Sequence, residues 1–432
     1  MSTTAATETT TVVPSWNELK TKISLTSVGK ALDDDKKLRL IGKGSPNVHN
    51  KLRLFNDEDD SDNNGSGKET KYTIYRDHAA WCPYCQKTML LIEAKNIPIS
   101  IELINMRSYG DKPSSFLRKV PNGLLPALEE NNTSKKVILD SAYIMEYLEN
   151  EYSDKQMIPS RSKQPEQFSR YQKLMNLERE LFSWWCTFMF QPDDSYVSPS
   201  MNGFLNCLET VNTALSNTAG PYFLDYTIDT PTMIDFVFAS HIERMVASCA
   251  YWKGMNLRSA VEYPKLDAVQ KWMDALEKHD YYLAFKSDYY THVKDIPPQY
   301  GPSSDGVSRL SKITQYKSDI EGGSGAGSSN AWKLPLEDDD TLQPLYNGIP
   351  LPKPVLQSVN IECDNDGSYK TSGNGPGISK FASRGGPNGS KNIRKTFEYL
   401  RDRIGVPRDL PLASARYLRA YLNWAIDVLR VQ

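Results

Sequence analysis

An α/β domain followed by an all-α domain, with an extension at each end of the chain, is the fold class that this sequence predicts. First, residues 71–152 show a strand–helix–strand pattern, then a strand hairpin and one more helix. Second, strand patterns stop after Tyr152, and long helices with apolar faces take over. Because the chain has 432 residues, more than one core usually organises, two or three domains are expected.

The α/β part consists of short patterns whose period alternates. "KYTIYRD" and "ISIELINM" are typical of strands, and "CPYCQKTMLLIEAKN" between them has apolar residues at helical spacing. "ALEE" and "KKVILD" predict a hairpin turned by "NNTS", and "SAYIMEYLENEY" predicts an amphipathic helix that buries Ile144 and Leu148. A strand–helix–strand unit followed by a hairpin and a covering helix is the layout of a thioredoxin-like sheet.

Two long helices dominate the all-α part. "QFSRYQKLMNLERELFSWWCTFMF" predicts the first, and "MIDFVFASHIERMVASCAYW" predicts a second that is more fully buried. Thr232, with Asp235 three positions later, forms a capping-box pattern, so we expect Asp235 to cap the second helix rather than to take part in chemistry. Aromatic residues of the first helix can line a substrate pocket between the domains, but their helical spacing favours a place in the core: Trp184, Trp185 and Phe188.

The ends of the chain and its linkers complete the predicted organisation. "NIRKTFEYLRDRIG" and "SARYLRAYLNWAIDVLR" predict two C-terminal helices, which should dock on the rest of the protein because so small a pair is not stable alone. The second helix carries an apolar stripe of Leu418, Leu422, Ala425 and Leu429. Linker composition marks Asn56–Thr70, Glu321–Asn330 and Asp364–Ser390. The predicted division is an N-terminal extension with an acidic linker (1–70), a thioredoxin-like domain (71–152), an all-helical domain (153–300), a low-complexity linker region (301–390) and a C-terminal helical segment (391–432).

Composition excludes several classes of protein. The net charge of −2 indicates no nucleic-acid partner, and no apolar run approaches the roughly 20 residues that a membrane span needs. The first twenty residues lack the features of a secretory signal, so the predicted location is the cytoplasm, with the plastid as the alternative because this stretch is rich in Ser, Thr and Ala. Six cysteines in a chain of this length do not make a disulfide framework, which indicates a reducing compartment.

The chemistry is concentrated in "CPYC", where Cys82 should lie at the N-terminus of a helix and Pro83 suits its first position. Unpaired backbone N–H groups and the helix dipole stabilise a thiolate there, and such cysteines have pKa values of about 3.5 to 7.5 against about 8.5 for a free one. Cys85 lies one turn further in, so Cys82 should attack and Cys85 can act as the resolving thiol.

Other uses of the pair are less favoured. Zinc takes four ligands, whereas the pair supplies two and the other cysteines are scattered, so no metal site is predicted. A permanently oxidised, inert pair is the other alternative. A C-x-x-C pair before a helix in a strand–helix–strand setting indicates redox chemistry instead.

Two further stretches point toward the same site. In "NGLLPALEE", Pro126 directly precedes a strand, where thioredoxin-like sheets usually have a cis proline, and the backbone of Leu125 could then hold a peptide-like ligand beside Cys82. At the start of the next helix, Asp140 and Ser141 with the free N–H groups form an anion site or, alternatively, a plain N-cap without a ligand.

These residues together resemble the glutathione transferase superfamily, over about Lys71 to Pro298. "CPYC" is similar to the glutaredoxin-type active site, "LLPAL" to the family's cis-proline loop, "DSAYIMEYLE" to its acidic–serine motif and "TPTMID" to its capping box. "YGDKPSSFLRKVPNGLLPAL" is similar to the omega class, whereas "SWNELK…KLRLF" and the C-terminal helices look most like iota-type transferases of photosynthetic organisms.

The resemblance implies an all-α glutathione-transferase domain after the thioredoxin-like one, and glutathione as the ligand. The glutathione sulfur would lie by Cys82, its backbone by Leu125 and Pro126, and its γ-glutamyl carboxylate at Asp140 and Ser141, with Lys112 as a further contact. A cysteine in this position implies a mixed disulfide with glutathione, and hence thiol transfer, deglutathionylation or dehydroascorbate reduction rather than conjugation. Because Cys85 stands where omega enzymes have another residue, a dithiol route stays open.

The expected acceptor is a small-molecule or protein disulfide or a glutathionylated substrate, and the expected assembly is a homodimer. Two rival functions remain. One is a non-catalytic glutathione-binding scaffold whose extensions dock partners, and the other is a carrier that holds an iron–sulfur cluster or haem through Cys82 and glutathione.

Overall fold

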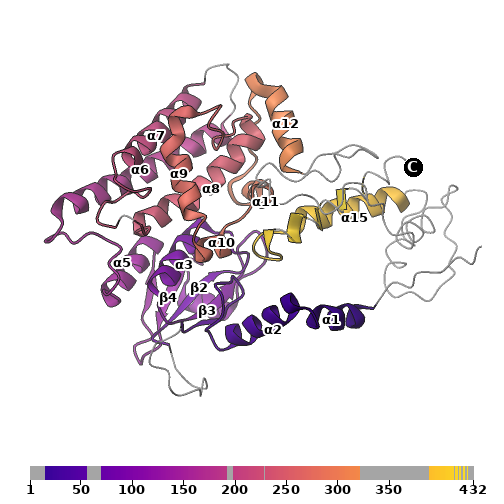
Figure 1. Cartoon of the computed structure of the whole chain (residues 1–432), viewed down its shortest axis with the longest axis horizontal. Coiled ribbons are helices and arrows are strands. Elements are labelled where there is room, and N and C mark those ends of the chain that lie inside the picture. Colours follow the sequence, from indigo (N-terminus) through magenta and orange to yellow (C-terminus); the bar gives the residue numbers. More distant parts are fainter. Residues whose placement is uncertain are drawn as a thin grey trace, which may run out of the picture.

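The computed structural model describes residues 15–55, 70–191, 198–227, 229–321 and 389–412, and after them positions 414–416, 418–419, 422–423 and 426. In this part of the chain, a mixed sheet with its own helices lies beside a group of long helices, and α3 (Pro83–Lys95) lies between the two (Figure 1). No helix within these ranges is both long enough and apolar enough to cross a membrane.

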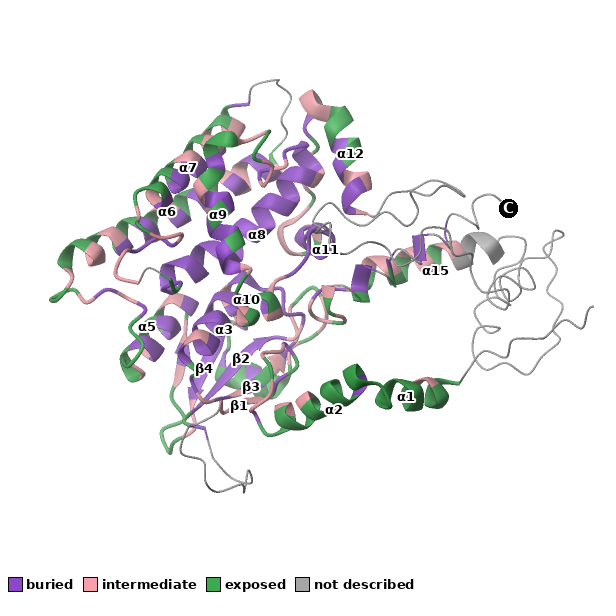
Figure 2. Cartoon of the chain, viewed as in Figure 1, coloured by how far each residue is buried: buried purple, intermediate pink, exposed green. Residues whose placement is uncertain are grey.

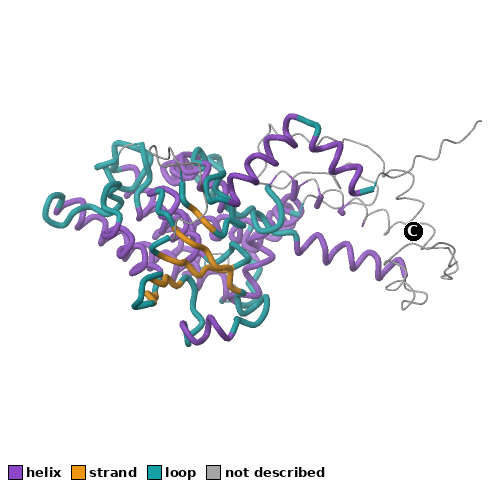
Figure 3. Tube along the Cα trace, turned by 90° about the horizontal axis from the view of Figure 1, so that it is seen from below, coloured by secondary structure: helices purple, strands orange, loops and turns teal. Residues whose placement is uncertain are grey.

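The sheet has the topology that the sequence predicts, with one strand more. Its strands lie together among the surrounding helices and loops (Figure 3). β2 pairs in parallel with β3, whereas β4 pairs antiparallel with β2 and β5 antiparallel with β4, so the thioredoxin-like arrangement is confirmed. The additional strand β1 comes from the N-terminal segment and pairs antiparallel with β3 at the edge of the sheet. In sheet order, the strands are β1 (Leu52–Arg53), β3 (Ile99–Ile104), β2 (Tyr72–Asp77), β4 (Ala127–Glu130) and β5 (Val137–Leu139).

The helices of the α/β part also follow the predicted pattern. α3 begins with Pro83 at its first position and ends at Asn96, which takes the left-handed conformation with φ of 56°. Almost every residue of α3 is buried, because α8 and α10 of the helical part and α5 pack against it. The remaining helices here are α4 (Ser114–Lys119) and α5 (Ser141–Glu151), and α5 buries Ile144 and Leu148 as expected.

In the helical part, α8 is the central element and is buried along nearly its whole length (Figure 2). The Asp235 carboxylate accepts hydrogen bonds from the Thr232 N–H (2.7 Å) and hydroxyl (2.8 Å), and also from the indole N–H of Trp272 (2.9 Å). The predicted capping role is therefore confirmed and extended to a contact with another helix. The long helices are α6 (Pro165–Phe190), α7 (Pro199–Ser216) and α8 (Met233–Lys253); the shorter ones are α9 (Asp267–Leu276), α10 (Asp280–Phe285), α11 (Tyr289–Tyr300) and α12 (Leu310–Ile320), with single 3-10 turns at Pro264–Leu266 and Val307–Arg309.

α12 corrects one prediction, because it lies inside the range 301–390 that we predicted as a low-complexity linker. Ile313, Tyr316 and Ile320 recur at helical spacing and are buried, and the helix packs on α8. The predicted linkers lie outside the described residues except at their ends.

The N-terminal segment forms α1 (Trp16–Ser24) and α2 (Ser27–Leu40), two largely exposed helices that were not predicted (Figure 2). The buried guanidinium of Arg53, on β1, donates to both carboxylate oxygens of Glu93 on α3, at 2.8 and 2.7 Å. This bidentate pair and strand β1 join the N-terminal segment to the sheet domain.

At the other end of the chain, α15 (Gly389–Arg403) and the helical residues after it dock on α11 and α12. Arg419 is buried and ion-paired with Asp288, and the Asn423 side chain donates to the Glu321 carbonyl at 2.7 Å. Leu422 is buried, but Leu418 is 40% exposed, so the predicted apolar stripe is wrong at Leu418. The docking face is the one that carries Arg419, Leu422 and Asn423, and Leu418 lies outside it. Ala425 and Leu429 lie outside the described residues.

Candidate active site

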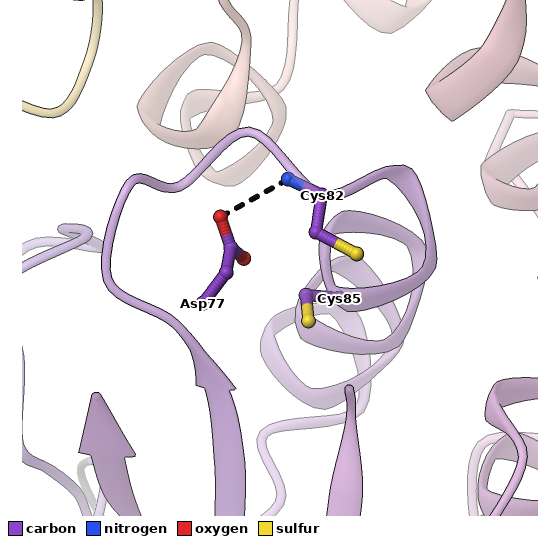
Figure 4. A group of neighbouring side chains, drawn as sticks. All are labelled: Asp77, Cys82 and Cys85. Atoms are coloured by element: carbon purple, nitrogen blue, oxygen red, sulfur yellow. Dashed lines mark hydrogen bonds between the residues drawn. The ribbon is translucent and has the colours of Figure 1, made fainter. Parts of the chain in front are cut away.

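Cys82 occupies the N-cap of α3, as the sequence predicts, with Pro83 directly after it. The chain leaves β2 at Asp77, turns through four residues and enters the helix at Cys82 (Figure 4). Only 9% of Cys82 is exposed and 2% of Cys85, and Figure 4 shows the two side chains on neighbouring positions of the same helix end. The sulfur atoms and a carboxylate oxygen of Asp77 all lie within 4.8 Å of one another.

The surroundings shift the pKa values of the two thiols in opposite directions. Hydrogen bonding from the Cys85 side chain is the leading cause that lowers the pKa of Cys82, and the backbone N–H groups of Cys85 and Tyr84 lower it further against the effect of burial. Burial, followed by the hydrogen bond to Cys82, raises the pKa of Cys85 well above its usual value. Of the two cysteines, Cys82 is therefore the one whose surroundings favour ionisation, and Cys85 is the one whose surroundings oppose it. We expected the helix N-terminus to act alone, whereas the second cysteine is the stronger contributor.

Asp77 fixes the loop that carries Cys82. One of its carboxylate oxygens accepts hydrogen bonds from the backbone N–H of Trp81 (2.7 Å) and of Cys82 (3.0 Å), while the other is buried without a hydrogen-bond partner among the described residues. With the two sulfurs it makes three potential ligand atoms, one fewer than a structural zinc site uses. The position of Asp77 at the end of a strand is the sequence signal that could have identified it.

Trp81, the residue before Cys82, is held by the helical part of the protein. Its indole N–H donates to Nδ1 of His292 (3.2 Å), and its carbonyl accepts from the buried guanidinium of Arg244, which also lies 4.7 Å over the ring. Arg244 reaches the Gln86 side chain as well (3.2 Å), one turn into α3. Helices α8 and α11 therefore hold Trp81 before the cysteine, and α8 also contacts the Gln86 side chain after it.

Lys112, the predicted glutathione contact, is half-buried on the loop before α4. Burial lowers the pKa of its ammonium group, and charge on Cys85 or Cys82 acts in the opposite sense, so the group lies within electrostatic range of both sulfurs. Its stem packs against Gly123, which has φ of +65°, and a Cβ added there would lie 3.4 Å from the Lys112 stem. Glycine at position 123 thus allows both the turn and the lysine beside it.

The remaining predicted ligand contacts lie on the loop before β4 and at the start of α5. The Leu125–Pro126 peptide bond is cis, as predicted, with Leu125 partly and Pro126 fully buried. Asp140 is the N-cap of α5, and its carboxylate accepts from the N–H groups of Ala142 (2.8 Å) and Tyr143 (3.2 Å). Asp140 itself therefore uses two of the amides that we assigned to an anion. Ser141 is buried, and its hydroxyl has no hydrogen-bond partner among the described residues.

The aromatic residues weighed as pocket lining are mostly core. Trp185 and Phe188 are each 1% exposed, and the Trp185 indole N–H donates to the Ser248 hydroxyl at 2.9 Å. Trp184 is partly buried and packs on Gly203 of α7, where a Cβ would clash with its ring.

The chain matches one protein-family model and several known proteins over part of its length. Residues 81–151 match the family model for the glutathione S-transferase N-terminal domain. The chain is 38% identical over 79 residues to glutathione S-transferase omega-1 of Sus scrofa, a match that covers 18% of this chain and 31% of that protein. It is 24% identical over 176 residues to glutathione S-transferase DHAR2 of Arabidopsis thaliana, covering 41% and 72%. The crystal structure of glutathione transferase Omega 3C from Trametes versicolor aligns with a TM-score of 0.42 at 19% identity, covering 51% and 91%.

The class that fold and site define is a thioredoxin-like domain with a cysteine at the start of its first helix, joined to an all-helical domain. The predicted resemblance to the glutathione transferase superfamily is confirmed, with omega-class and DHAR proteins among the relatives. The resemblance to iota-type transferases stays a prediction. The match spans about a third of the length of the first omega relatives.

Proposed function

We propose that this protein is a glutathione-dependent thiol transferase whose nucleophile is the Cys82 thiolate. The observation that carries the proposal is the place of Cys82 at the N-cap of α3 with Cys85 beside it, where hydrogen bonds lower the pKa of Cys82 while burial raises that of Cys85. The match to a glutathione S-transferase N-terminal domain supports glutathione as the partner of that thiolate.

The proposed reaction has two exchanges. In the first, the Cys82 sulfur attacks the glutathione sulfur of a glutathionylated acceptor, a Cys82–glutathione disulfide forms, and the acceptor leaves as a thiolate that takes up a proton. In the second, the thiolate of another glutathione attacks that disulfide, so oxidised glutathione leaves and the Cys82 thiolate returns. The net reaction reduces the acceptor and oxidises glutathione, and Cys85 serves only as a hydrogen-bond donor.

The other site residues act on glutathione rather than on the sulfur. We assign Lys112, Leu125, Pro126 and Ser141 to glutathione contacts, and Asp140 to the start of α5 beside them. Dehydroascorbate is a second acceptor to test, because one relative carries the name DHAR2. A homodimer and a location in the cytoplasm, with the plastid as the alternative, stay predictions.

Intact-protein mass spectrometry after treatment with oxidised glutathione tests the nucleophile. Wild type and Cys85→Ser should gain one glutathione, and Cys82→Ser should gain none. An adduct on Cys82→Ser, or none on Cys85→Ser, would remove the proposal, whereas a wild type that loses two hydrogens instead of gaining glutathione would assign Cys85 as the resolving thiol. Binding of glutathione without turnover of any disulfide would favour a scaffold, and a visible absorbance band of the freshly purified protein would favour a cluster or haem carrier.

A further inference from the structure

Lys87 lies on α3, five positions after Cys82, and is buried although it ends in an ammonium group. The residue is 4% exposed, and its nitrogen lies 5.4 Å from the centre of the Tyr84 ring in the "CPYC" turn. Among the described residues it makes no hydrogen bond and no ion pair. The nitrogen is not one of the fully enclosed unpartnered polar atoms of the described residues, and it lies within electrostatic range of Cys82.

The carboxylates around Lys87 already have other partners. Glu178 on α6 accepts from Arg179 at 2.6 and 2.7 Å, and it lies 2.6 Å from Nδ1 of His241. Asp140 accepts from the first amides of α5. These two acids and the charges of Arg179 and Cys82 are the groups that act on the lysine electrostatically, and neither acid forms an ion pair with it.

A charge in this position is costly for the fold. Burial lowers the pKa of Lys87 to about 8, with Glu178 opposing that effect, so the folded protein holds the cation against the cost of desolvation. An apolar side chain of similar length would fill the same space without that cost. Groups that destabilise the fold without compensation are typical of places where a ligand supplies the missing partner.

We infer that Lys87 binds a carboxylate of the bound ligand, on the side of the site formed by α3, the start of α5 and α6. The inference rests on the proposed function and deepens it, because it names an anionic group as something this site recognises. The carboxylate can belong to glutathione, which has two, or to the acceptor joined to its sulfur. The chemistry at Lys87 is the same in both cases.

Calorimetric titration with two unreactive thioethers tests the inference and separates these sources. S-(2-carboxyethyl)glutathione carries a carboxylate in the acceptor position, whereas S-(2-hydroxyethyl)glutathione carries a neutral hydroxyl there, and neither needs turnover. The variants are Lys87→Met, which keeps the apolar stem, and Lys87→Arg, which keeps the charge. Lys173→Met is the matched control, because it removes the same charge from an exposed position on α6.

If Lys87 binds a carboxylate of glutathione, Lys87→Met should weaken both thioethers by about tenfold, the effect of one charge-assisted hydrogen bond. If it binds the acceptor, only the carboxyethyl compound should weaken. Lys87→Arg should restore most of the affinity in either case, and Lys173→Met should bind like wild type. Equal affinities of wild type and Lys87→Met for both compounds would overturn this inference alone. A wild-type protein that binds neither compound would overturn the proposed function as well.

Thermal unfolding of the same variants excludes a merely structural role. Lys87→Met should unfold at the same temperature as wild type or higher, because it removes a buried charge that has no partner. A variant that loses both affinity and thermal stability, without rescue by Lys87→Arg, would also overturn the inference.

Discussion

Two buried aspartates, each beside the start of a helix, differ in how fully they are paired. At α11, Asp288 accepts from the Thr291 N–H (3.1 Å) and hydroxyl (2.6 Å) with one oxygen, and it is ion-paired with Arg419 through the other. At α3, Asp77 accepts two backbone N–H bonds with one oxygen, and its other oxygen is buried without a partner among the described residues. The fully paired Asp288 joins two distant segments of the chain, whereas the partly paired Asp77 lies beside Cys82 and Cys85. Complete pairing marks the part that holds the structure together, and incomplete pairing marks the part that is open to a ligand.

The largest expected effect is a loss of activity on substitution of Cys82, beside the partly paired Asp77. Cys82→Ser should lower the rate of deglutathionylation by a factor on the order of 10³ or more, because a serine hydroxyl is not ionised at neutral pH and cannot form a disulfide. The measurement is release of glutathione from a glutathionylated peptide, with Cys207→Ser, a buried cysteine outside the site, as the control. If Cys82→Ser were as active as wild type, the partly paired Asp77 beside Cys82 would not mark a site of catalysis.

At the fully paired Asp288 we expect a loss of stability rather than of chemistry. Arg419→Met should destabilise the folded protein by about 3 to 5 kcal/mol, because it leaves the Asp288 carboxylate buried and without its cation. Urea unfolding measures this, and Lys271→Met, which breaks an exposed pair with Asp267, should cost less than about 1 kcal/mol. Similar losses in the two variants would contradict the contrast between the regions.

Acid should reveal the same contrast. Burial alone would raise the pKa of Asp288, but Arg419 and Thr291 outweigh it and lower the pKa below 3.8. The stabilisation is therefore complete above the unfolded-state value and is lost as the pH falls through the lower folded-state value. The difference in stability between wild type and Arg419→Met should accordingly shrink below about pH 4.

Lys87 should make stability rise with pH as well, but in an alkaline window and because its charged form is the destabilised one. Burial lowers its folded-state pKa from 10.5 to about 8, so between these values the unfolded chain binds more protons than the folded one. Wild type should therefore gain stability relative to Lys87→Met as the pH rises from 8 toward 10.5, by up to about 3 kcal/mol. Chemical denaturation at several pH values checks this. If the difference in unfolding free energy between wild type and Lys87→Met stayed constant across that range, the cost of burying the Lys87 charge would be compensated within the fold.

The smallest effects distinguish two replacements of Cys85. Cys85→Ser keeps a hydrogen-bond donor for the Cys82 thiolate, so turnover should stay within about threefold of wild type. Cys85→Ala removes that donor and should raise the pKa of Cys82. The pH dependence of alkylation by iodoacetamide reports this pKa directly. If the two variants had identical profiles, the backbone amides rather than the Cys85 side chain would be the main cause of the lowered pKa of Cys82.

The sequence predicts the elements whose patterns are local. The strands β2 to β5 and the helices α3, α5, α6 and α8 follow from periodicity, and Cys82 follows from its place before Pro83. β1 is two residues long and has no pattern of its own, so only its partner β3 reveals it. α12 was missed because the glycine-rich stretch after it dominates the composition of the predicted linker range.

The candidate site is predictable in its nucleophile but not in its surroundings. Lys87 reads as an ordinary helix-forming residue, and its burial results from packing against helices nearly a hundred residues or more away in sequence. The clamp on Trp81 likewise depends on Arg244 and His292, which only the folded chain brings to it. Asp140 differs, because we predicted it as part of an anion site, whereas its carboxylate accepts hydrogen bonds from the first N–H groups of α5.

The edge position of β1 has a practical consequence for anyone trimming this protein to its catalytic part. Cutting at residue 71, where the composition changes, would strip β1 from the sheet and expose the backbone N–H and C=O groups of β3 that now pair with it. It would also leave the Glu93 carboxylate buried without its ion-pair partner Arg53. A shortened protein would tend to aggregate through its bare edge, whereas one that begins before α1 would keep its sheet closed on that side.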